Sequence, residues 1–120
     1  MALSERESNT PLEDAIFAYN EGRYSDALPV FEELAKTGNI EATCGLAEMY
    51  LRGEGVEKDV EHGLKLLRRS VDLGHANSAF NLGALHRSGA DGVPKDLGLS
   101  KQFFLRAKEL GCDLPVDDYI

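Results

Sequence analysis

Two stretches of the chain repeat each other. Residues 46–59 read LAEMYLRGEGVEKD, and residues 82–96 read LGALHRSGADGVPKD. The leucines that open both stretches and the first glycines of both loops align at an offset of 36 residues. The glycine, valine, lysine and aspartate that follow align at an offset of 37, because the second loop carries one extra residue. Similarity at a fixed period of this length is typical of a repeat architecture.

A more divergent third copy precedes these two. It is found by anchoring the copies on three glycines, which are Gly38, Gly74 and Gly111. Eleven residues before each glycine stands a small residue: Ala27, Gly63 or Ser100. Small side chains at equivalent positions let paired helices approach closely. The anchoring glycines suit the ends of helices, because glycine enters the left-handed backbone conformation at little cost.

Apolar residues recur at spacings of three and four, and no run alternates with the period of two that indicates a strand. This pattern predicts six helices, over residues 11–21, 25–37, 40–52, 59–73, 76–88 and 96–110. Thr10, Pro11 and Glu13 predict a capping box with proline at the first helical position. Asp59 and Asp96 stand where N-caps are expected, and Pro29 is expected in the first turn of its helix. Because one helix pair cannot bury its own apolar face, the pairs are expected to stack into an all-α solenoid.

The domain organisation follows from the repeats. We expect a flexible tail at residues 1–9 and a helical repeat domain at 10–112, with units 10–39, 40–75 and 76–112. Residues 113–120 are expected to cap the last pair, since solenoid ends expose an apolar face. The capping side chains would be Leu114, Val116, Tyr119 and Ile120. The alternative is that the end faces of two copies meet, so the chain is expected to be a monomer or a weak homodimer.

Composition excludes several classes of protein. The 120 residues include 13 Lys and Arg and 21 Asp and Glu, for a net charge of −8, and 42% are hydrophobic. A balance this acidic disfavours binding to nucleic acid or to anionic membranes. The chain has no signal-peptide pattern and no apolar run of about 20 residues, so the cytoplasm is the expected location. Cys44 and Cys112 are too few for a disulfide scaffold, and both are expected to be free thiols.

The repeated residues resemble the Sel1-like repeat family, a relative of the tetratricopeptide repeats. The glycine-valine-aspartate loop carries the resemblance in residues 42–75 and 76–112. Residues 12–38 are more similar to a tetratricopeptide unit, through Ala15, Gly22, Tyr24, Ala27 and Phe31. The resemblance implies a right-handed superhelical stack of about three helix pairs that binds proteins or peptides. It implies no cofactor and no chemistry of its own.

No catalytic or metal-binding constellation is visible in the sequence. His62, His75 and His86 do not stand at metal-ligand spacings, and none is close in sequence to a cysteine. His86 replaces a packing tyrosine and is expected to be structural. The loop Gly53-Glu54-Gly55 is interpreted as a hairpin, since it lacks the lysine of a phosphate loop. We therefore expect no catalytic residue, metal or cofactor, with an enzyme of unrecognised type as a remote alternative.

A partner is expected on the concave face, which the first helices of the pairs line in such solenoids. Positions at fixed distances from the small packing residue nominate Ile16, Tyr19, Asn20, Cys44, Glu48, Leu51, Arg52, Phe80, Ala84, Arg87 and Ser88. Aromatic, aliphatic and arginine side chains are typical of interface anchors. The alternative for Leu51 and Phe80 is that they complete the core between units. Arg52 and Arg87, one unit apart, could hold an acidic or C-terminal peptide.

The expected function is that of a non-catalytic adaptor or regulator in the cytoplasm. The alternative is an immunity or inhibitor protein that neutralises a cognate toxin or effector. Residues 1–41 carry nine acidic and three basic residues, a net charge of −6. This local excess would steer a partner with a basic surface toward the first unit, although it would also serve solubility.

Overall fold

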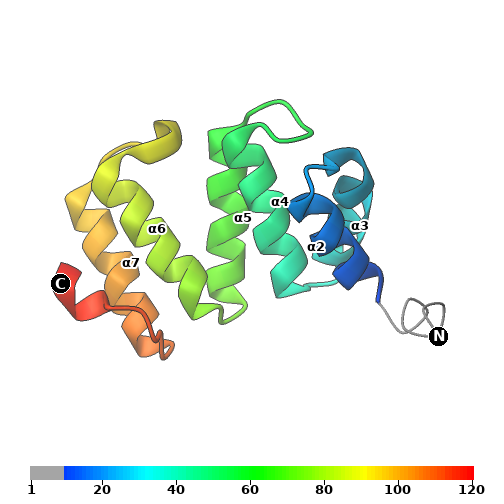
Figure 1. Cartoon of the computed structure of the whole chain (residues 1–120). Helices are drawn as coiled ribbons and strands as arrows, with labels where there is room; N and C mark the ends of the chain where they lie inside the picture. Colours follow the sequence, from blue (N-terminus) through cyan, green and yellow to red (C-terminus); the bar gives the residue numbers. More distant parts are fainter. Residues whose placement is uncertain (1–9) are drawn as a thin grey trace.

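The computed structural model describes residues 10–120, and within them the chain forms six α-helices and no strand (Figure 1). The helices are α2 (Pro11–Asn20), α3 (Tyr24–Lys36), α4 (Ile40–Arg52), α5 (Val60–Asp72), α6 (Ala76–Ser88) and α7 (Leu97–Glu109), with two short 3₁₀ turns, η1 (Ala90–Gly92) and η2 (Val116–Tyr119). Each helix begins and ends within one residue of the bounds predicted from the sequence. The flexible tail predicted at residues 1–9 lies outside the described residues.

Successive helices pair into hairpins, and the hairpins stack side by side along an elongated body of 51 × 31 × 23 Å (Figure 1). The pairs are α2 with α3, α4 with α5, and α6 with α7, while α3 packs on α4 and α5 packs on α6. The first and the third helix pair lie at opposite ends of this body. This arrangement confirms the predicted all-α solenoid of three helix pairs.

The helix starts are fixed by side chains that accept hydrogen bonds from exposed backbone amides. Thr10 and Glu13 form the predicted capping box. Asp59 accepts from the amide of His62 at 3.0 Å, and Asp96 accepts from the amide of Leu99 at 3.0 Å. The N-cap predictions are therefore confirmed, which explains why the helix bounds could be predicted so closely.

The predicted position of Pro29 is wrong. α3 begins at Tyr24, so Pro29 is the sixth residue of the helix and lies inside it, beyond the first turn. Proline has no amide proton, so the carbonyl of Ser25 receives no hydrogen bond from position 29. The ring of Pro29 is exposed, which limits its steric cost to the helix itself.

Small residues bring the paired helices into close contact, as the sequence predicts. Ala27 and Ala47 are fully buried. At Gly83 on α6, an added Cβ would lie 2.9 Å from the ring of Phe104 on α7. The hydroxyl of Ser100 donates to the carbonyl of Gly83 at 2.6 Å. The third pair therefore packs backbone against side chain at this point, where no larger residue fits.

The loop between α4 and α5 also ties two units together. Glu54 accepts a hydrogen bond from Tyr19 at 2.6 Å through Oε1 and from Tyr24 at 3.0 Å through Oε2. Burial, followed by the hydrogen bond to Glu54, raises the pKa of Tyr19 far above its ordinary value. The hydrogen bond to Glu54 is also the main cause of a raised pKa at Tyr24. The hairpin loop thus fastens the second unit to the first.

The segment after α7 returns onto the last helix pair. Val116 is buried, and the ring of Tyr119 stacks on Phe104 at a centroid distance of 4.7 Å. Tyr119 also contacts Phe80 edge-on at 5.9 Å. Leu114 and Ile120, expected to share in this cap, are each 39% exposed. The apolar contacts of the C-terminal segment are therefore made by Val116 and Tyr119, and Asp117 adds an ion pair with Lys108 at 2.8 Å.

Candidate protein-binding site

A hollow of about 190 Å³ lies between α4 and α6, the first helices of the second and third pairs. α4 supplies Glu48, Leu51 and Arg52, and α6 supplies Asn81, Ala84 and Leu85, while Leu67 and Asp91 complete the lining. Leu51 and Leu67 are buried and form an apolar floor. The charged residues Glu48, Arg52 and Asp91 give the hollow a polar rim.

An ion pair organises this rim. Nη2 of Arg52 lies 3.1 Å from Oε2 of Glu48, one helical turn away on α4. The negative charge of Glu48 is the main reason that the pKa of Arg52 is raised, and Asp91 acts in the same direction. The side chain of Arg52 is 55% exposed, so it stays accessible for a second carboxylate.

Asp91 adopts a left-handed backbone conformation, which is uncommon for residues other than glycine. Its φ angle is 57°, and within residues 10–120 it alone has a positive φ without being glycine. Asp91 belongs to the longer loop of the third unit, which carries the extra residue that breaks the repeat register. Left-handed non-glycine residues cost about 1 kcal/mol or more and cluster at binding sites.

The structure brings four of the predicted interface residues together at this hollow: Glu48, Leu51, Arg52 and Ala84. Leu51 is only 4% exposed, so it contributes to the floor and to the core. Ile16, Tyr19 and Asn20 lie on α2, outside this hollow. The hydroxyl of Tyr19 also donates a hydrogen bond to Glu54.

The remaining predicted residues on α6 are already engaged by the chain itself. Phe80 packs edge-on against Phe104 at 5.2 Å and against Tyr119. The guanidinium of Arg87 lies 5.1 Å from the centroid of the Tyr119 ring. Ser88 donates to the carbonyl of Ala84 and accepts from the amide of Ala90. The C-terminal segment therefore packs on Phe80 and contacts Arg87, which stays exposed.

Sequence reasoning missed Leu67, Asn81, Leu85 and Asp91 as lining residues. Asn81 and Leu85 directly follow the predicted residues Phe80 and Ala84 on α6. The prediction took single positions at fixed distances from the small packing residue and did not include these neighbours. Asp91 could have been predicted from the sequence, because an extra residue in one loop of a repeat marks a local difference between units.

Cys44 lies close to His75 in space, although no histidine is near it in sequence. Its Sγ is 3.2 Å from Ser78 Oγ and 3.6 Å from His75 Nδ1. His75 Nδ1 accepts from the Ser78 amide at 3.2 Å and thereby caps α6. Residues 10–120 hold no group of three side chains that could bind a metal ion. The cluster is thus a helix cap, with a thiol beside it.

His86 has the structural position expected of it. It is buried, Nδ1 lies 2.9 Å from the carbonyl oxygen of Pro94, and its ring stacks on Phe103.

None of the helices in residues 10–120 combines the length and the apolar character needed to cross a bilayer.

Comparisons with known proteins give a consistent answer. The Sel1 repeat matches residues 40–75 and 76–112. The ERAD-associated E3 ubiquitin-protein ligase component HRD3B from Arabidopsis thaliana is 28% identical over 102 residues, which are 83% of this chain and 17% of that protein.

Two solved structures share the fold. A Sel1 repeat protein from Oxalobacter formigenes matches with a TM-score of 0.67 and 27% identity, over 86% of this chain and 44% of its own. The protective antigen c5321 from uropathogenic Escherichia coli matches with a TM-score of 0.69 and 24% identity, over 84% of this chain and 23% of its own. The chain therefore spans less than half the length of each of these three proteins. Because the Sel1 repeat covers more than half of its residues, the chain belongs to the Sel1 repeat family, a family of protein-interaction modules.

Proposed function

We propose that the chain is a non-catalytic adaptor or regulator in the cytoplasm, and that it binds a partner protein at the hollow between α4 and α6. The observation that carries this proposal is the pairing of an apolar floor with an exposed arginine at the rim. An interface anchor needs an apolar pocket and a directed polar contact. Leu51 and Leu67 supply the floor, and Arg52 supplies the contact.

The size of the hollow favours a protein partner. A volume of about 190 Å³ is smaller than the roughly 300–1,000 Å³ of small-molecule sites. It suits one inserted side chain of a larger surface, with a neighbouring carboxylate on Arg52. HRD3B is named as a component of a ligase, so one relative works within an assembly of proteins.

The second candidate function is that of an immunity or inhibitor protein. The charge distribution favours it, because residues 10–41 carry seven acidic and two basic residues. Many targets that act on nucleic acid are basic, and an acidic unit would accelerate their capture. An inhibitor would bind one partner tightly and block its activity, whereas an adaptor would bind without blocking.

Affinity capture from the native host tests the proposal. The wild-type chain is compared with Ala84→Arg, which fills the hollow from an exposed position of α6 and lowers helix propensity only slightly. The matched control is Lys65→Ala on α5, which does not line the hollow. We expect Ala84→Arg to reduce recovery of the partner about tenfold or more and Lys65→Ala to leave it unchanged. Equal recovery of the partner by both variants would show that the binding site lies elsewhere.

A further inference from the structure

A second hollow lies on the first helix pair, away from the α4–α6 site. It measures about 830 Å³ and lies between α2 and α3. Phe17, Ala18 and Val30 give it apolar walls, and the carboxylates of Glu13, Asp14 and Asp26 stand around them. Phe17 is 60% exposed, an unusual exposure for a phenylalanine. We call this surface the α2–α3 hollow.

The three helix pairs of the described chain differ in the elements that pack against them. The α4–α5 pair is covered by α3 on one side and by α6 on the other. The α6–α7 pair is covered by α5 and by the C-terminal turn η2. Within residues 10–120, the first pair packs against α4, and Phe17 on α2 stays exposed. An exposed apolar surface that is surrounded by polar residues is typical of a protein interaction site.

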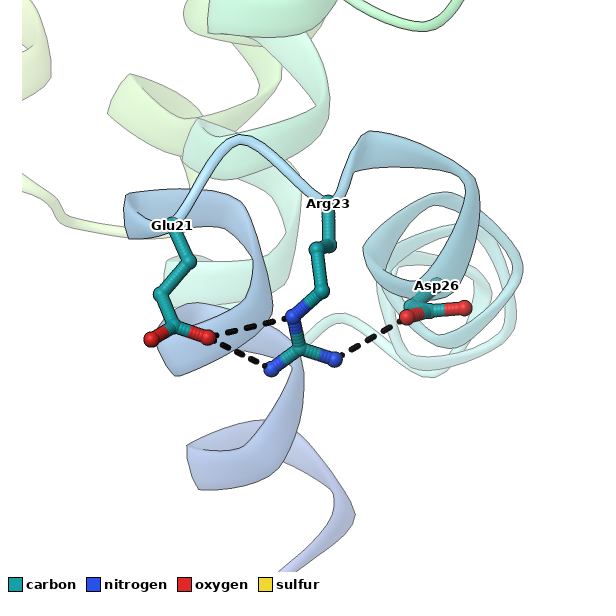
Figure 2. Close-up of polar contacts among 3 residues, drawn as sticks. All are labelled: Glu21, Arg23 and Asp26. Atoms are coloured by element: carbon teal, nitrogen blue, oxygen red, sulfur yellow. Dashed lines mark hydrogen bonds and ion pairs between the residues drawn. The ribbon is translucent and has the colours of Figure 1, made fainter.

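One arginine of the chain shows which chemistry this surface recognises (Figure 2). Arg23 donates from Nε and Nη2 to Oε1 of Glu21 at 3.1 and 2.9 Å, and from Nη1 to Asp26 at 3.0 Å. Its guanidinium lies 5.9 Å from the centroid of the Phe17 ring. Carboxylates beside an exposed aromatic ring are the groups that hold guanidinium ions.

We propose that the α2–α3 hollow is the docking site for a basic amphipathic helix of a partner protein. The apolar side of that helix lies on Phe17 and Val30, and its arginine and lysine side chains lie against Glu13 and Asp14. A helix in a groove between two helices is a common mode of peptide recognition. The inference concerns another face than the α4–α6 hollow and does not depend on it.

Charge decides between this occupant and a second copy of the chain. Two copies that met through their α2–α3 hollows would bring carboxylates against carboxylates, a like-charge contact that costs several kcal/mol. Strand addition is excluded for residues 10–120, because they contain no sheet edge to extend. A helix whose apolar face is bordered by cations is complementary both to the apolar walls of the hollow and to the carboxylates around them.

Peptide binding to the full chain tests the proposal. The probe is an amphipathic peptide of 13 residues, as long as α3, with leucines on one face and arginines elsewhere. Two comparison peptides replace the arginines by glutamates or scramble the order of the residues. Binding is measured by fluorescence anisotropy and located by amide chemical shifts. We expect the basic amphipathic peptide alone to bind, with shifts confined to α2 and α3.

Matched variants locate the contact. Phe17→Ala is expected to weaken binding about tenfold, while Leu97→Ala, at a residue that is also 60% exposed but on α7, leaves it unchanged. Glu13→Gln with Asp14→Asn is expected to weaken binding about threefold and to reduce its salt dependence. Glu32→Gln with Glu33→Gln changes the net charge by the same amount at positions outside the hollow. This control pair is expected to weaken peptide binding less. Ala84→Arg leaves peptide binding unchanged, which separates this inference from the proposed function.

Four results would each overturn the inference. The first is equal binding of the scrambled or acidic peptide. The second is an equal loss of peptide affinity in the control variants, which are Leu97→Ala and Glu32→Gln with Glu33→Gln. The third is a wild-type dimer in sedimentation that Phe17→Ala dissociates, since a second copy would then occupy the hollow. The fourth is peptide binding that appears only after removal of residues 1–9, since the chain's own N-terminal segment would then be the occupant.

Discussion

Replacement of Glu54 by alanine tests how the first two units are held together. The Glu54 carboxylate accepts from Tyr19 at 2.6 Å in a half-buried setting, and from Tyr24 at 3.0 Å. A hydrogen bond to a charged group contributes about 1.5–3 kcal/mol. Water reaches this loop, so the lower end of that range applies to the Tyr19 bond. The change is expected to lower the free energy of unfolding by about 1.5 kcal/mol, with a further loss from Tyr24.

Thermal and urea unfolding, followed by circular dichroism, measure this loss. For a chain of this length, about 1.5 kcal/mol corresponds to a fall in Tm of roughly 6 °C. Glu57→Ala is the matched control, because Glu57 lies exposed in the same loop, and it is expected to change stability by less than about 0.5 kcal/mol.

A double-mutant cycle isolates the contact itself. Tyr19→Phe is expected to destabilise the wild-type chain by about 1 kcal/mol and to have almost no effect when residue 54 is alanine. The reasoning would be refuted if Glu54→Ala and Glu57→Ala melted at the same temperature, or if the penalty of Tyr19→Phe were the same in both backgrounds.

Three further predictions concern single positions. The raised pKa of Tyr19 means that its contribution to stability is full below about pH 10 and is lost as the pH rises further, because the unfolded chain ionises first. Urea melts at several pH values check this, and the dependence should weaken in Glu54→Ala. His75→Ala removes the N-cap of α6 and should cost about 1 kcal/mol, while His75→Asn should restore most of it; equal losses would contradict the capping role. Gly83→Ala places a methyl group 2.9 Å from Phe104 and should destabilise by about 1–3 kcal/mol, whereas a gain in stability would show that the helices are not in close contact there.

The helix bounds and the stacking could be predicted from the sequence because both depend on local signals. The Thr10 capping box, the aspartate N-caps and the glycines after the helices each act within four residues. The repeat then indicates which helices pair, since each unit has the same pattern. Pro29 is the exception, because even the predicted start at residue 25 places it fifth in the helix, beyond the roughly 3.6 residues of the first turn.

The candidate site was less predictable because it depends on contacts between distant residues. The tyrosines that bind Glu54 lie 30 and 35 residues away in sequence. The last residues of the chain pack on Phe80 and contact Arg87, which stays exposed, through the ring of Tyr119. The repeat pattern describes what units have in common, whereas these contacts arise at the two ends and in one loop, where the units differ.

Site-specific photo-crosslinking in the native host tests the central claim most directly. A photoreactive amino acid replaces Ala84 in the α4–α6 hollow or, as the control, Arg68 on the exposed side of α5. The account predicts a specific crosslink to a partner protein from position 84 and none from position 68. A crosslink to that same partner from position 68, with none from position 84, would contradict it.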